Sequence, residues 1–149
     1  MSTNIGYNDD SISNRPSENS ITKDDTVITL ERHPTQSHTP VYSLTIYSNG
    51  TVIYNGIKNV KISGKQTSTI PKSSINELVN EFINIYYFAL KDKYDQPNVF
   101  DRPIVTTSIS MNGKTKTVFH HHGSTAAPNG LSLLENKIDT ITNSKQWTE

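Results

Sequence analysis

The chain has 149 residues, which suits one domain, and its 14 basic side chains balance 14 acidic ones. Zero net charge argues against a protein whose overall field attracts nucleic acid or acidic membranes, and the absence of cysteine excludes a fold that depends on disulfides. With only 32% hydrophobic residues, the sequence predicts one folded domain and a polar tail rather than 149 packed residues.

Residues 1–25 have few large apolar side chains, and these follow neither a helical nor an alternating period. They predict a disordered polar tail, followed by a single domain over residues 26–149. No apolar run approaches the roughly 18 residues of a membrane span, and no signal peptide opens the chain. We expect a cytoplasmic protein without a membrane span, although an exported protein that had lost its leader would look the same.

The strongest structural signal is the segment Pro40–Gly56, in which two runs rich in β-branched and aromatic residues flank a turn at Asn49-Gly50. This pattern is typical of a β-hairpin. Alternation along the first run predicts that the side chains facing the core are Tyr42, Leu44 and Ile46.

A second hairpin is predicted around Asn112-Gly113, and its register matters for the core. A two-residue turn would pair Ile109 with Lys116 and place a lysine on the apolar face. A three-residue loop with a bulge would pair Ile109 with Thr115 instead. Because burying an unpaired lysine costs several kcal/mol, we expect the bulged loop.

By analogy we expect a bulged loop in the first hairpin as well. That loop pairs Ile46 with Val52 and Leu44 with Tyr54, whereas a two-residue turn would pair Ile46 with Ile53.

The remaining elements follow from periodicity. Strands are predicted at Thr26–Arg32 and Ile57–Ile70, and an amphipathic helix is predicted at Ser74–Tyr86. A last helix begins at Pro128, its apolar seam consists of Leu131, Leu134, Ile138 and Ile141, and Trp147 is expected to fold back onto the domain. The sequence thus predicts an α+β fold, a two-layer sandwich of an antiparallel sheet with both helices on one face, in the order β-β-β-β-α-β-β-α.

Histidines are the most suggestive chemical feature. On a strand, His120 and His122 point to the same side, so they could form half of a zinc site. If the first and last strands end near each other, His33 or His38 could supply a further ligand. The alternative is a polar strand end with solvated histidines.

A binding surface is the other candidate. The outer side of the first hairpin carries Tyr47 and Thr45 beside Ile53, a combination that suits contact with a partner. The sequence shows no nucleophile elbow and no phosphate-binding glycine loop, so no catalytic residue or cofactor is expected. We therefore favour a non-enzymatic binding module for an unknown protein or small-molecule ligand, to be sought by pull-down. The alternative is metal binding or histidine-based enzymatic activity at His120–His122.

The stretch from Arg32 to Tyr42 reads Arg-x-x-Thr-x-x-x-Thr-Pro-x-Tyr. It resembles the signature Arg-x-x-Cys-x-x-x-Cys-Pro-x-Tyr of a family of bacterial and archaeal domains of unknown function. The resemblance covers about residues 26–147 and is carried by Arg32, Pro40, Tyr42, Gly50, Val52, Tyr54, Gly56, Phe88, Tyr94, Asp101, Pro103, Gly113 and His120. Since the two cysteine positions are Thr35 and Thr39 here, a disulfide or thiolate metal site cannot operate in this chain. The resemblance implies no activity.

Overall fold

The computed structural model describes residues 21–149, so most of the predicted tail of residues 1–25 lies outside the described residues. The described part of that segment contacts the domain. The Thr22 hydroxyl donates to Asn76 Oδ1 over 2.5 Å, and the Asp25 carboxylate accepts hydrogen bonds from the backbone N–H groups of Asn112 and Gly113.

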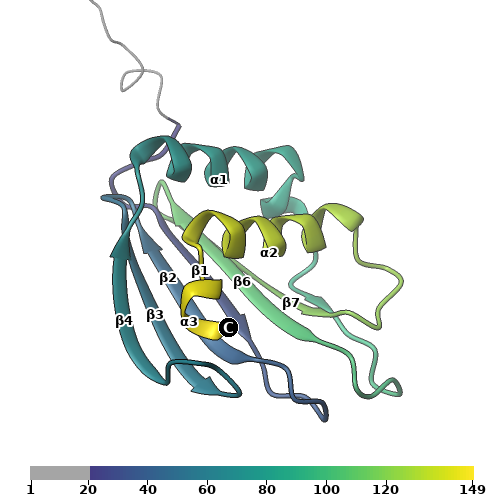
Figure 1. Cartoon of the computed structure of the whole chain (residues 1–149). Coiled ribbons are helices and arrows are strands. Elements are labelled where there is room, and N and C mark those ends of the chain that lie inside the picture. Colours follow the sequence, from purple (N-terminus) through teal and green to yellow (C-terminus); the bar gives the residue numbers. More distant parts are fainter. Residues whose placement is uncertain (1–20) are drawn as a thin grey trace, which may run out of the picture.

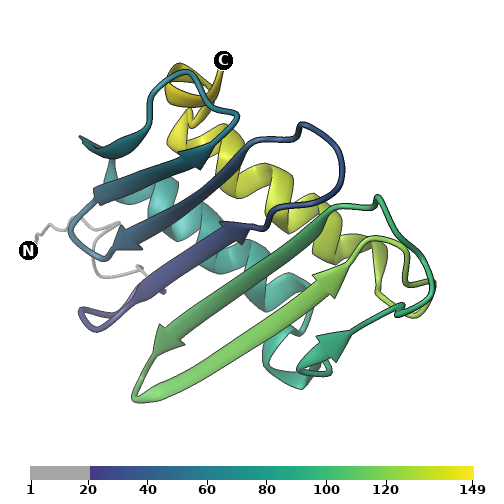
Figure 2. The same ribbon diagram turned by 90° about the horizontal axis from the view of Figure 1, so that it is seen from below.

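Two main helices cover one face of an open sheet, as the predicted α+β sandwich requires (Figure 1). Seen from below, the sheet lies in front of both helices (Figure 2). In chain order the elements are β1 (Val27–Arg32), β2 (Val41–Tyr47), β3 (Thr51–Lys58), β4 (Gly64–Thr69), α1 (Lys72–Asn84), the 3-10 turn η2 (Tyr87–Ala89), β5 (Lys93–Tyr94), β6 (Ile104–Met111), β7 (Lys114–His121), α2 (Asn129–Thr142) and α3 (Lys145–Thr148).

Within residues 21–149 the sheet has seven strands in the order β4-β3-β2-β1-β6-β7-β5. All neighbouring strands are antiparallel except β5, which pairs with β7 in parallel, so the sheet is mixed rather than purely antiparallel. Strand β5 has only two residues and lies in a stretch rich in aspartate and proline, which carries no strand pattern. The predicted strand Ile57–Ile70 is also too long, because β4 begins at Gly64.

The first hairpin has the predicted register. Ile46 pairs with Val52, and Leu44 pairs with Tyr54. Gly50 has a φ of 93°, a conformation that favours glycine, and a Cβ atom there would lie only 2.4 Å from the carbonyl oxygen of Ile70.

The predicted register of the second hairpin is wrong. Ile109 pairs with Lys116 across a two-residue turn, in which Asn112 and Gly113 both have positive φ values. The lysine is tolerated because it is not unpaired: its ammonium group donates to the carbonyl oxygen of Leu90 and, over 2.7 Å, to the Asp92 carboxylate. The desolvation cost that argued against this register is therefore largely offset.

The helices bury the predicted stripes except at their ends, where Ile141 of α2 is only partly buried and α1 differs at Tyr86. That helix buries Ile75, Leu78, Val79 and Phe82, and α2 buries Leu131, Leu134 and Ile138. Tyr86, predicted to continue the stripe, is instead left-handed and 78% exposed. Tyr87 takes the buried position, where its hydroxyl lies 2.8 Å from that of Thr107. Trp147 folds back as predicted and stacks on Tyr54 at 4.9 Å.

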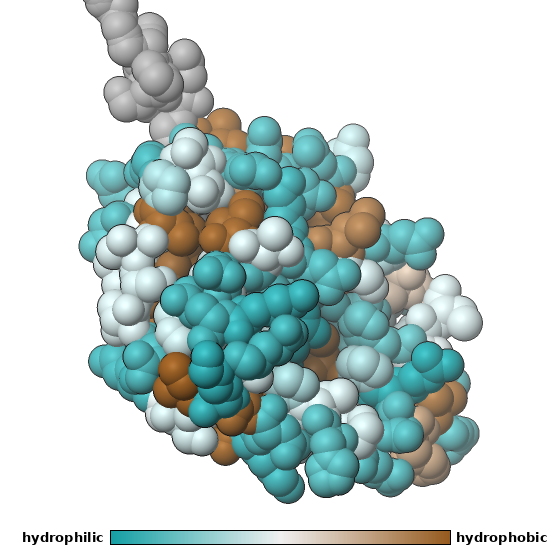
Figure 3. All heavy atoms as spheres, viewed as in Figure 1, coloured by the Kyte–Doolittle hydropathy of each residue, from teal (hydrophilic) through white to brown (hydrophobic). Residues whose placement is uncertain are grey.

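No helix within residues 21–149 combines the length and apolar character needed to cross a bilayer. The face shown in Figure 3 is largely hydrophilic, and its apolar residues form small separate groups.

Candidate metal centre and adjoining pocket

Strand pairing brings four residues into one row across the sheet, near the strand ends. Tyr42 pairs with Arg32, Arg32 with Val105, and Val105 with His120. Because paired residues point to the same side of a sheet, the row faces the helices. The middle of α2 lies over the row and contributes two carboxylates one helical turn apart, those of Glu135 and Asp139.

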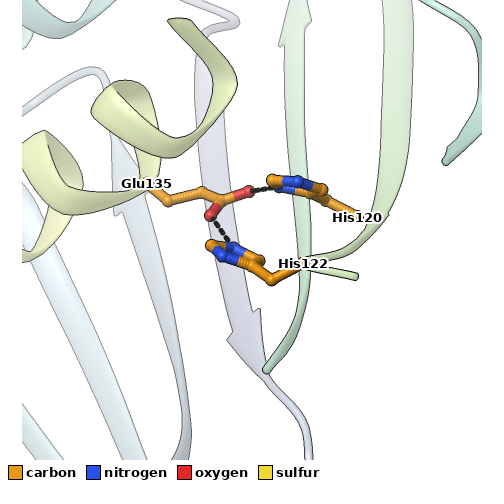
Figure 4. A group of neighbouring side chains, drawn as sticks. All are labelled: His120, His122 and Glu135. Atoms are coloured by element: carbon orange, nitrogen blue, oxygen red, sulfur yellow. Dashed lines mark hydrogen bonds and ion pairs between the residues drawn. The ribbon is translucent and has the colours of Figure 1, made fainter. Parts of the chain in front are cut away.

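Glu135 joins two histidines at one end of this row. Its Oε2 lies 2.6 Å from His120 Nδ1, and its Oε1 lies 2.7 Å from His122 Nε2 (Figure 4). The two imidazole rings stack with their centroids 4.1 Å apart. Glu135 and His120 are buried, whereas the His122 side chain is 26% exposed. The cluster is thus closed on the helix side and reaches solvent through His122.

The buried carboxylate is stabilised in its ionised form. Burial by itself would raise the pKa of Glu135, but the hydrogen bonds and positive potential of His120 and His122 outweigh it and hold that pKa below its ordinary value. Each oxygen of the carboxylate has an imidazole partner, which offsets the cost of removing the charge from water.

The same three side chains fit the ligand set of a transition metal. The nearest ligand atoms of His120, His122 and Glu135 all lie within 4.8 Å of one another. Zinc binds imidazole nitrogen and carboxylate oxygen at about 2.0–2.2 Å in tetrahedral geometry, so its ligand atoms are about 3.3 Å apart. The carboxylate–imidazole distances of 2.6 and 2.7 Å, each to a different oxygen of Glu135, are shorter than this separation. The full set of ligand atoms spreads up to 4.8 Å, which is longer, so the side chains must shift to hold an ion.

The structure brings together only part of the predicted histidine set. His120 and His122 point the same way, as expected, but the other two lie elsewhere. His33 bonds Thr106 over 2.8 Å, on the side of the sheet away from the helices, and His38 is exposed in the loop before β2. The third ligand atom comes from Glu135, which the sequence-based reasoning missed. A signal was present, because Glu135 falls on the buried stripe of α2 between Leu134 and Ile138.

Asp139 organises a second cluster at the other end of the row. Its Oδ2 accepts hydrogen bonds from Arg32 Nε and Nη2, at 3.0 and 2.6 Å. Its Oδ1 accepts from the hydroxyls of Tyr42 and Ser144, at 2.5 and 2.6 Å. A pocket of about 400 Å³ opens beside this cluster, between the strand ends and α2.

The model of the family described as a domain of unknown function, DUF6438, matches residues 26–142. The chain belongs to this family. Comparison with curated proteins gave no match. The finer resemblance, to a signature with paired cysteines, stays a prediction. In this DUF6438 domain the hydroxyls of Thr35 and Thr39, which stand at those cysteine positions, lie 3.1 Å apart.

Several residues that carry the resemblance to the cysteine signature lie in or beside the row of paired strand residues described above. Arg32, Tyr42 and His120 belong to it directly, and Tyr94 extends it because β5 pairs Tyr94 with His120. All residues of the two clusters lie within the matched region, residues 26–142, except Ser144.

The proposed interaction surface lies on the sheet face that the helices leave uncovered. Thr45 and Ile53 are direct partners across β2 and β3 and are partly exposed, and Tyr47 is 39% exposed. Its role in binding stays a prediction.

Two buried tyrosines predict how the stability of the domain depends on alkaline pH. Burial raises the pKa of Tyr42, as does the neighbouring Asp139 carboxylate, and burial also raises the pKa of Tyr87. Their contribution to stability is complete below pH 10.0, the ordinary tyrosine pKa, and is lost as pH rises above it, because the unfolded chain then releases protons that the folded chain keeps. We expect the urea midpoint to fall above about pH 10, and to fall less steeply in Tyr42→Phe and Tyr87→Phe. An unchanged slope in both variants would contradict this.

Proposed function

We propose that this DUF6438 domain is a non-enzymatic binding domain whose ligand is a divalent transition metal ion, with zinc as the best fit. The observation that carries the proposal is the convergence of His120, His122 and Glu135, whose ligand atoms lie within 4.8 Å of one another.

The donor set supports a transition metal over calcium or magnesium. Imidazole nitrogen suits zinc, copper, iron and nickel, whereas calcium and magnesium prefer oxygen ligands alone. Two histidines and one glutamate would supply three of four tetrahedral positions, leaving the fourth to water. The partly exposed ring of His122 gives the ion a route to the site.

Two of the three ligands are carried by rigid elements. Glu135 is fixed on α2 and His120 on β7, and both are at most 3% exposed, so little side-chain freedom is lost when an ion binds. The ion would take the place of the imidazole protons that face Glu135, which would move to the other ring nitrogen or to solvent, and the Glu135 carboxylate would neutralise part of its charge.

The proposal assigns no reaction. Ser124 is the hydroxyl nearest to His122 along the chain, and it accepts a hydrogen bond from the backbone N–H of Ala126, an arrangement that does not support an activated nucleophile. The proposal therefore goes no further than metal binding.

Titration of the metal-free domain with zinc chloride should show one binding site of micromolar or tighter affinity by isothermal calorimetry. Replacing His122 by alanine should weaken binding at least tenfold, because one of three protein ligands is lost. His38→Ala is the matched control: it removes an exposed histidine outside the centre and should leave the affinity unchanged. Zinc at a hundred times its Kd should raise the free energy of unfolding by about 2.7 kcal/mol.

Two outcomes would overturn the proposal. One is the absence of binding heat at neutral pH. The other is a zinc affinity that survives His122→Ala but falls in His38→Ala, which would place the ion on surface histidines.

A further inference from the structure

The pocket beside Asp139 has a size and lining that suit a small ligand. Its volume of about 400 Å³ lies within the range of ligand pockets, and its wall is formed by the ends of β1, β2 and β6, by α2 and by the C-terminal residues. None of the three proposed metal ligands lines it. A ligand in this pocket would therefore occupy a site separate from the metal centre.

Arg32 and Asp139, the paired charged residues that line the pocket, leave donors rather than acceptors available to a ligand. Both oxygens of Asp139 are already saturated, by Arg32, Tyr42 and Ser144. Arg32 has five N–H groups, and its hydrogen bonds within residues 21–149 use only the Nε group and one on Nη2. The remaining N–H groups are free to bind a carboxylate, which matches the guanidinium fork in shape and charge.

The other charged and titratable lining residues are consistent with an anion. Lys145 lies at the rim and is 76% exposed, and the His33 ring is turned to Thr106 on the other side of the sheet, so neither counts as a donor to the ligand. The remaining acidic side chain, Glu149, is 67% exposed and lies 4.0 Å from Lys145, so it faces solvent more than the pocket. Asn136, on α2 between the two carboxylates, adds an amide that can donate to the same ligand.

One wall is apolar. The apolar lining residues are Pro40, Pro103, Ile104 and Val105, the last of which is the strand partner of Arg32. Such a wall would receive an apolar body while the charged end of the ligand meets Arg32.

We infer that this pocket binds a small carboxylate with a compact apolar body, the carboxylate on Arg32 and the body against Pro103, Ile104 and Val105. The proposal goes beyond metal binding, because it concerns a second site on the same side of the sheet.

The probe is 2-naphthoate, with the neutral amide 2-naphthamide as its matched control. Titration of ¹⁵N-labelled domain should shift the amide signals of Ile104, Val105 and Thr140, and the carboxylate should bind at least tenfold more tightly than the amide. Thr140→Trp fills the pocket from an exposed helix position without touching the Arg32–Asp139 pair, and should weaken naphthoate binding at least tenfold. Asn84→Trp, at an exposed position on α1 away from the pocket, should not.

Equal affinity for the acid and the amide would overturn the inference, as would shifts that lie outside the pocket or binding that survives Thr140→Trp. The dispersion of the spectrum reports whether each variant is folded. His122→Ala is titrated in parallel and should bind naphthoate like the wild type. Failure of the zinc site and failure of the pocket are therefore distinguishable.

Discussion

Replacing Glu135 by alanine is expected to lower the free energy of unfolding by about 3–5 kcal/mol, because it breaks a buried charged cluster by removing its central member. The carboxylate accepts from both His120 and His122, and it is only 1% exposed. Without it, two imidazole N–H groups lose their acceptor, and the His120 group is buried. Urea unfolding of the metal-free protein at pH 7 measures the effect.

Two variants separate this effect from the general loss of a glutamate. Glu135→Gln keeps the shape and one acceptor oxygen, so it should cost about 1–3 kcal/mol. Glu77→Ala removes an exposed glutamate on α1 whose partner is Lys137, and should cost less than about 1 kcal/mol. If Glu135→Ala were no more destabilising than Glu77→Ala, the cluster would contribute nothing to stability.

The fold was largely predictable because most of its signals are local. The apolar stripes of the two helices and the alternation in the first hairpin each depend on neighbouring residues, and these elements appear where the sequence predicts them. The parallel strand β5 was not predictable in this way, because it has only two residues, too few for a strand pattern. Its pairing with β7 joins segments that are distant in the sequence.

Two of the departures from the sequence-based predictions share a physical cause: the partner of a polar side chain lies far away in the sequence. The local sequence predicts an unpaired Lys116 on the apolar face, yet its acceptors come from Leu90 and Asp92, more than 20 residues earlier. The same holds for the metal centre. His120 and His122 are recognisable from their spacing alone, but only the packing of α2 on the sheet brings Glu135 to them. Both partners follow from tertiary contacts that sequence periodicity does not encode.

The second large effect is expected at Asp139. Its replacement by alanine should lower the free energy of unfolding by about 3–4 kcal/mol, because Arg32 would be left as a partly buried charge without its counterion. The side chains of Arg32 and Asp139 are only 21% and 18% exposed, so solvent screens the pair less than a surface ion pair. Tyr42 and Ser144 would lose the same acceptor.

A double-mutant cycle tests whether the pair itself, rather than the packing of α2, accounts for this loss. Arg32→Met keeps most of the apolar stem, and the coupling energy with Asp139→Ala should be about 1–3 kcal/mol. The exposed pair of Lys145 and Glu149 provides the control, with a coupling below about 0.5 kcal/mol. A coupling near zero for Arg32 and Asp139 would mean that the carboxylate acts mainly through Tyr42 and Ser144. Arg32 would then owe its position to the sheet, and its remaining N–H groups would be less firmly directed toward the pocket.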